Sequence, residues 1–264
     1  MLNRREFLGT TIGAAAAGML TGEAMAAAQT EHPDTVIELR QYTLRGGKRD
    51  VLIKMFEESF QQPLNDGGVH VIGTFRDLDD PDRFVWLRGF RDMASRPQAL
   101  SSFYYGPVWK AKRSEANATM LDSDNVLLLK PTGPDSGFHS ASSAGKDDII
   151  GANIYYLGNG DAQAFVKFFD ESMLPHIAEL GAKPIARFVS EESPNNFPAL
   201  PVREHERVFV WFARWPNLDA ENTFANRFHA LSGWRDKTPE ALFSALMRKP
   251  ERLRLAPNAK SELR

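Results

Sequence analysis

The first predicted strand carries side chains that could bind or polarise a small molecule. Side chains alternate between the two faces of a strand, so Glu38, Arg40 and Tyr42 share one face. The guanidinium could neutralise an anionic or enolate oxygen, and the phenol could orient it. The alternative is that Glu38 and Arg40 form an ion pair at a strand end, with a structural role.

Histidines are the other candidates for proton transfer. His70, His176 and His229 could each act as a general base or a haem ligand, or could be ordinary core or surface residues. No two histidines of the chain have the H-x-H or H-x-x-x-H spacing of a metal site. The sequence therefore predicts no metal centre and identifies no cofactor.

Composition narrows the class of partner. The chain has 264 residues, of which 42% are hydrophobic and 25% charged, and its net charge is −2. This balance argues against a nucleic-acid partner, while a small hydrophobic ligand and a homo-oligomer remain open. There is no cysteine, which excludes disulfides, thiolate nucleophiles and cysteine-ligated metals.

The N-terminus has the pattern of an export signal. Asn-Arg-Arg-Glu-Phe-Leu-Gly at residues 3–9 precedes a short Gly- and Ala-rich run, which is too weakly apolar to predict a membrane span. It resembles the twin-arginine signal of bacteria, although Asn3 and Gly9 depart from that pattern. An ordinary secretory signal with a chance arginine pair is the alternative. We expect residues 1–28 to be a signal peptide and the protein to be periplasmic or secreted.

The remaining chain aligns with itself. When Ile37 is placed over Ile150, many aromatic and glycine positions of residues 36–131 stay in register with residues 149–257. The second copy has an extra segment at residues 194–201. The Gly-, Pro- and Ser-rich residues 132–148 are typical of a linker.

This alignment relates the candidate residues of the two halves. Asn153 and Tyr155 fall on Arg40 and Tyr42, and Trp211 falls on Trp86. Matched tryptophans favour core packing, and stacking on a flat ligand is the alternative.

Two of the histidines, His70 and His229, are the preferred candidates because the matching position in the other half holds a different residue. His70 and His229 correspond to Lys183 and Tyr104, as expected of site residues in a duplicated fold.

Each half has the predicted order β-α-β-β-α-β, which is the ferredoxin-like unit. Its helices cover one face of the sheet. We expect the other face to carry Phe84 and Trp86 in the first half, and Phe209 and Trp211 in the second. Pairing the two sheets would bury these faces. The predicted fold is therefore α+β, with two tandem units forming a pseudo-dimeric α/β barrel. Arg40, Tyr42, Asn153, Tyr155, Trp86 and Trp211 are then expected to face its lumen as ligand-binding residues.

Two motifs resemble the NIPSNAP family. They are Ile-Glu-Leu-Arg-Gln-Tyr-Thr-Leu at residues 37–44 and Phe-Tyr-Tyr-Gly-Pro-Val-Trp at residues 103–109. The resemblance implies the dimeric α/β-barrel fold and transfers no catalytic residue.

Three functional hypotheses follow from the motifs and the resemblance. The first is an exported NIPSNAP-family protein that binds a small hydrophobic or aromatic molecule in the lumen. The second is a cofactor-free monooxygenase- or isomerase-like enzyme in which Arg40 stabilises the anion and His70 or His229 moves the proton. The third is a haem-binding protein.

Overall fold

The computed structural model describes residues 34–139, 145, 148–231, 238, 240–242, 246 and 249–264. The predicted signal peptide and parts of the predicted linker lie outside the described residues. Within the described part of the chain, no helix is long and apolar enough to cross a bilayer.

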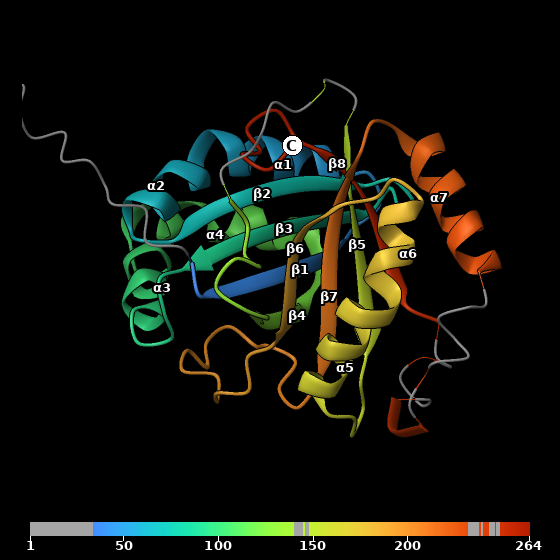
Figure 1. The fold of residues 1–264 in the computed structure, drawn as a ribbon. Coiled ribbons are helices and arrows are strands. Elements are labelled where there is room, and N and C mark those ends of the chain that lie inside the picture. Colours follow the sequence, from blue (N-terminus) through green and yellow to red (C-terminus); the bar gives the residue numbers. More distant parts are fainter. Residues whose placement is uncertain are drawn as a thin grey trace, which may run out of the picture. The chain divides into compact units, whose positions relative to one another are not determined.

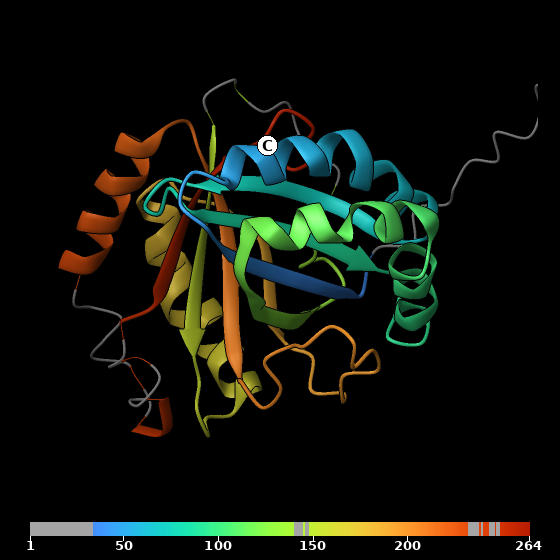
Figure 2. The same cartoon turned by 180° about the vertical axis from the view of Figure 1, so that it is seen from behind.

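The described part is a mixed α/β structure in which two halves repeat one order of elements (Figures 1 and 2). The first half contains β1 (Val36–Leu44), α1 (Arg49–Met55), η1 (Phe56–Phe60), α2 (Gln61–Asp66), β2 (His70–Asp77), β3 (Arg83–Phe90), α3 (Arg96–Tyr104), α4 (Pro107–Thr119) and β4 (Met120–Pro131). The second contains β5 (Ile149–Tyr156), α5 (Ala162–Phe168), η2 (Phe169–Met173), α6 (Leu174–Glu179), β6 (Pro184–Ser190), β7 (Val208–Trp215), α7 (Leu218–Ala230), η4 (Glu240–Leu242) and β8 (Glu251–Pro257).

The strands close into one barrel in the order β1-β3-β2-β8-β5-β7-β6-β4. Within each half the antiparallel ladders are long. The halves are joined by two short seams, where β2 pairs with β8 over Phe75 to Asp77 and β4 pairs with β6 over Leu129 to Pro131. The strands of one half cross those of the other at a steep angle, as in orthogonal sheet packing (Figure 1).

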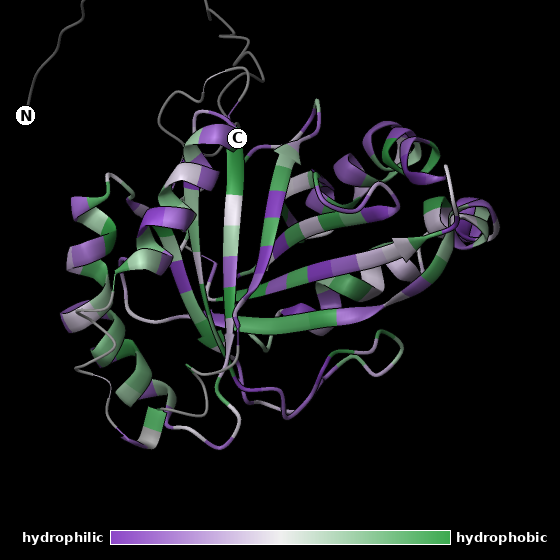
Figure 3. Ribbon diagram, turned by 90° about the vertical axis from the view of Figure 1, so that its right-hand side faces the viewer, coloured by the Kyte–Doolittle hydropathy of each residue, from purple (hydrophilic) through white to green (hydrophobic). Residues whose placement is uncertain are grey.

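The barrel interior is filled by aliphatic and phenylalanine side chains from both halves. Leu39 and Leu87 of the first half belong to the same buried cluster as Ile154 and Val210 of the second. Figure 3 shows apolar and polar residues alternating along the strands. Because successive side chains point to opposite faces, the residues of this cluster lie on one face and the residues next to them in sequence on the other. The lumen is thus a packed core.

The expectation that the aromatic faces of the two sheets meet in the lumen is wrong. Phe84 and Trp86 pack with α1, η1 and α3 of their own half, and Phe209 and Trp211 pack with α5, η2 and α7. The physical reason is that both faces of each sheet carry large apolar side chains. Alternation separates the faces but does not say which one the helices cover.

Both halves contain a π-helical turn in the helix that follows their first strand, η1 at Phe56–Phe60 and η2 at Phe169–Met173. A proline follows each turn closely, Pro63 after η1 and Pro175 after η2. Because proline has no N–H, it interrupts the α-helical hydrogen bonds at this point. In the first half, η1 directs Phe56 and Phe60 toward the sheet, where they pack on each other and on Phe103.

The extra segment of the second half reaches the first half. Residues 191–207 connect β6 to β7 and extend beneath β1 and β4 in Figure 1. Phe197 of this segment is buried in the aromatic cluster of the first half, 6.3 Å from the Tyr104 ring.

Candidate functional site

A cavity of about 390 Å³ lies between the β1–β3 face and the helices of the first half. This volume suits a small organic molecule. Arg40, Tyr42 and Trp86 line it, with Tyr104 on the helix side. Its apolar wall is largely aromatic and includes Phe56, Phe60, Phe84, Phe103, Trp109 and Phe197.

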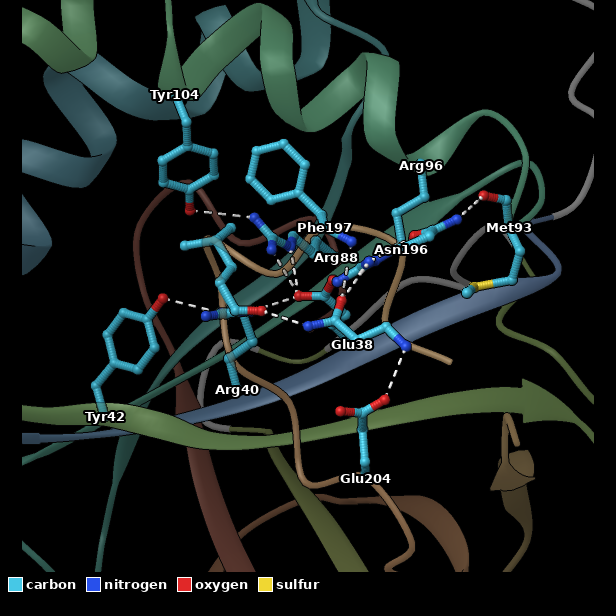
Figure 4. A network of polar contacts seen from close by, with 12 residues as sticks. Glu38, Arg40, Tyr42, Arg88, Met93, Arg96, Tyr104, Asn196, Phe197 and Glu204 are labelled. Carbon is cyan, nitrogen blue, oxygen red and sulfur yellow. Dashed lines mark hydrogen bonds and ion pairs between the residues drawn. The ribbon is translucent and has the colours of Figure 1, made fainter. Parts of the chain in front are cut away.

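A buried ionic network borders this cavity (Figure 4). Glu38 lies on β1 opposite Arg88 on β3, and Arg96 opens α3. The Glu38 Oε2 atom is 2.5 Å from Arg40 Nη1 and 2.6 Å from Arg88 Nη2, while Oε1 is 2.7 Å from Arg96 Nη2. These four side chains are at most 2% exposed.

The network holds more positive than negative charge. Three guanidiniums and one carboxylate leave a net charge of +2 in a region shielded from water. Burial by itself would raise the pKa of Glu38, but Arg88, Arg40 and Arg96 together hold the pKa well below its usual value. Glu38 is therefore ionised and saturated by its three partners.

Two tyrosines extend the network into the cavity. The Tyr42 hydroxyl accepts a hydrogen bond from Arg40 Nε at 2.9 Å, and the Tyr104 hydroxyl accepts one from Arg88 Nη1 at 3.2 Å. In Figure 4 both phenols lie on the side of the network opposite Arg96. Burial raises the pKa of Tyr42, so this phenol keeps its proton near neutral pH.

The second half supplies the roof of this site. Arg96 Nη1 donates to Asn195 Oδ1 at 3.0 Å and to Asn196 Oδ1 at 2.8 Å. Asn196 Nδ2 in turn donates to the Met93 carbonyl at 2.6 Å. These hydrogen bonds hold the extra segment over the first cavity, where Phe197 packs against the aromatic wall.

The second half has a cavity of its own, of about 600 Å³, between its sheet and α7. Asn153, Tyr155, Trp211 and His229 are among the residues that line it. Burial raises the pKa of Tyr155, as it does for Tyr42.

The charge network does not recur in the second cavity. The positions of Glu38 and Arg88 hold Gly151 and Ala213, which face each other across β5 and β7. Among the described residues that line this cavity, Glu221 and Arg252 form an ion pair. The two cavities are therefore equivalent in place and different in charge.

The predicted ligand-binding residues are brought together, but outside the lumen. Arg40, Tyr42 and Trp86 line the first cavity and Asn153, Tyr155 and Trp211 the second, each between sheet and helices. The predicted Glu38–Arg40 ion pair is present and buried within the strand. The same arginine also lines the cavity, so a role in ligand binding stays a prediction.

The two preferred histidines have different outcomes. His229 lines the second cavity. His70 lines neither cavity and lies 2.6 Å from Asp34 and 3.0 Å from Glu262. Hydrogen bonds that the ring donates to these two carboxylates raise the pKa of His70 to about 10. It is then protonated near neutral pH, so the proposed general base is wrong for His70.

Sequence reasoning missed Arg88, Arg96 and Tyr104. Arg88 carries a readable signal, because a lone arginine in the apolar strand Phe-Val-Trp-Leu-Arg-Gly-Phe must be buried with a partner. Its partner Glu38 comes from a strand 50 residues away. In the described part of the chain, no cluster of His, Asp and Glu could hold a metal ion.

Comparisons with known proteins agree with this fold. The NIPSNAP family model matches residues 37–134, so the first half is similar to a NIPSNAP domain. No curated protein matches the chain. A Fusobacterium nucleatum structure described as "putative monooxygenase" is 9% identical, covers 85% of this chain and 93% of its own, and has a TM-score of 0.54.

Two further structures are similar to this chain. A Lactobacillus acidophilus protein with the same description is 11% identical over 85% of this chain and 94% of its own, with a TM-score of 0.48. A NIPSNAP family protein from Agrobacterium tumefaciens is 22% identical over 38% of this chain and 89% of its own, with a TM-score of 0.36.

Proposed function

We propose that this protein binds a small hydrophobic or aromatic molecule in the cavity of its first half, between the sheet and the helices. The observation that carries this proposal is the cavity itself, about 390 Å³ with aromatic walls and a buried arginine on its surface. Pockets of this kind, mostly apolar with a few polar groups, are typical of small-molecule sites.

The proposal treats residues 36–131 and 149–257 as two NIPSNAP-like units, of which the second supports the first. The recurring order of elements and the equal pairing of β1 with β3 and of β5 with β7 favour this view. The family match itself covers residues 37–134.

Calorimetric titration with the neutral probe 2-naphthamide tests the binding site. Ala199 lines the cavity from the roof and is exposed, so Ala199→Trp should narrow the cavity without disturbing the core. Ala111→Trp, at an exposed position of α4, is the matched control. Binding that Ala199→Trp weakens at least ten-fold and Ala111→Trp leaves unchanged supports the proposal. No binding, or equal binding by both variants, contradicts it.

A cofactor-free monooxygenase- or isomerase-like reaction is the second candidate. It is favoured by the buried guanidinium of Arg40 beside Tyr42. This group would stabilise the enolate left when a bound ketone loses its α-proton to water, since no His, Asp or Glu is among the described lining residues. The shared fold with a structure described as a monooxygenase is compatible with it. Oxygen uptake with an enolisable aromatic ketone such as 2-tetralone, abolished by Arg40→Gln, would support it. Absence of uptake and of α-proton exchange would count against it.

Haem binding would use His229 on the wall of the second cavity. A haemin titration that produces no shifted Soret band, or the same band with His229→Ala, argues against this hypothesis.

We also infer from the sequence that residues 1–28 direct export by the twin-arginine route. Replacing both arginines, Arg4→Lys with Arg5→Lys, should retain the protein in the cytoplasm. Unchanged periplasmic recovery of the double variant would point to the ordinary secretory route.

A further inference from the structure

The polar side chains of the first half that lie around Trp86 offer donors to the cavity. Arg40 uses Nε on Tyr42 and Nη1 on Glu38, and its Nη2 atom has no hydrogen-bond partner among the described residues. The indole Nε1 of Trp86 is also buried without a partner there. A buried donor without an acceptor is costly, and a bound acceptor would remove that cost.

The two phenols add further donors. Each hydroxyl oxygen accepts a hydrogen bond from an arginine, Tyr42 from Arg40 and Tyr104 from Arg88. Its own hydrogen must then point elsewhere, and neither hydroxyl donates to a residue in the described ranges. Both side chains line the cavity, so these hydrogens are available to a ligand.

The donors surround one indole ring. The guanidinium carbons of Arg40 and Arg88 lie 5.7 and 5.1 Å from the centre of the Trp86 ring, and the Tyr42 ring lies 6.2 Å from it. Arg88 uses its nitrogens on Glu38 and Tyr104, whereas Arg40, Tyr42 and Trp86 are neighbours that all line the cavity.

The charged side chains around the cavity also favour a ligand with a negative charge. The only carboxylate of the network, Glu38, is occupied on both oxygens by guanidiniums. Among the described lining residues there is no Asp or Glu, whereas Lys110 and Arg113 add two more cations. A neutral ligand would leave the net charge of the network uncompensated.

We propose that the ligand of this cavity carries an anionic oxygen, as a carboxylate, phenolate or enolate, on a flat aromatic or hydrophobic body. Arg40, Tyr42, Tyr104 and Trp86 bind the oxygen, and the aromatic wall holds the body. This inference rests on the proposed function and adds the chemical class of the ligand. The second cavity lacks the network, so the preference belongs to the first half alone.

Two probes of equal shape separate this inference from the proposed function. Titration calorimetry at pH 7 compares 2-naphthoate with its neutral counterpart 2-naphthamide. Charge-assisted hydrogen bonds predict that naphthoate binds between about ten- and a hundred-fold more tightly. Equal affinity for the two probes overturns the anion preference and leaves the proposed function intact. If neither probe binds, both proposals fail.

Conservative variants test which side chains, and which of the two cavities, produce the preference for an anionic ligand. Tyr42→Phe and Arg40→Gln should each reduce naphthoate affinity at least five-fold and by a larger factor than naphthamide affinity, because the amide oxygen is an uncharged acceptor. Tyr155→Phe, the same change at the matching position of the second cavity, should alter neither. Equal loss of naphthoate binding in Tyr155→Phe and Tyr42→Phe would overturn the assignment to the first cavity. Tyr42→Phe keeps the ring, so it remains a valid test if Arg40→Gln does not fold.

Discussion

Arg96 and Asn196 come from different halves of the chain, and their side chains meet at 2.8 Å above the first cavity. Arg96 also binds the Glu38 carboxylate, which in turn binds Arg40 at the cavity surface. The roof contributed by the second half is therefore connected to the charged wall of the first by two ion pairs. The cavity depends on both halves.

Loss of the roof contact should affect stability and binding together. Asn196→Leu removes one acceptor of the buried Arg96 and the hydrogen bond to the Met93 carbonyl. We expect a loss of about 1–3 kcal/mol in the free energy of unfolding, measured in urea, and weaker naphthoate binding. Asn222→Leu, which removes a partly exposed acceptor of Arg254, should cost less and leave binding unchanged. Equal effects of the two variants would show that the roof is not coupled to the cavity.

Removal of the network's only carboxylate should be severe. Glu38→Gln leaves three buried guanidiniums without a counter-charge, and we expect a loss of about 3–5 kcal/mol in unfolding free energy. The exposed Glu58 is the matched control, because its contact with Lys54 is 3.9 Å long and Glu58→Gln should change little. Chemical denaturation measures both, and a Glu38→Gln variant as stable as Glu58→Gln would contradict the network as described.

His70 should make stability depend on pH in the alkaline range. Its pKa is raised from 6.5 to about 10 by hydrogen bonds to Asp34 and Glu262, so the folded state holds the proton more tightly than the unfolded state. The resulting stabilisation is complete below pH 6.5 and is lost as the pH rises toward 10. The melting temperature of the native chain should exceed that of His70→Gln near pH 6, and the gap should close by pH 10. A gap that widens with pH would disprove the contact.

The size of the ligand should depend on Phe197. Its side chain is 6% exposed and closes the cavity against Tyr104 and Tyr105. Phe197→Ala should lower 2-naphthoate affinity and raise affinity for the larger 1-pyrenecarboxylate, as measured by calorimetry. Phe138→Ala, which removes a ring packed on Phe188 and Phe212, is the control and should not change this ratio. If both variants change it alike, Phe197 does not set the size limit.

Local patterns identified the strands well. The predicted order β-α-β-β-α-β agrees with the order of strands and helices from β1 to β4. The ends of the strands do not follow from this order, and β4 begins at Met120, directly after α4. Such ends depend on pairing with another strand, which local sequence does not encode.

The candidate site was predicted only in part. Arg40, Tyr42 and Trp86 were identified because a strand places them on one face. Arg88 and Arg96 were missed, since their role depends on Glu38, which is 50 and 58 residues away in the chain. The roof at Asn195 and Asn196 was seen only as an extra segment, because its contact lies about a hundred residues away.

The sequence by itself determined which side chains share a face, because alternation along a strand is a local property of the backbone. Only the tertiary structure decided that the face with Arg40 and Trp86 meets helices and the face with Leu39 and Leu87 fills the barrel. Both faces carry large apolar side chains, so hydrophobic burial favours covering either one. The choice depends on how helices and the opposing sheet fit against each face, which involves residues from the whole chain.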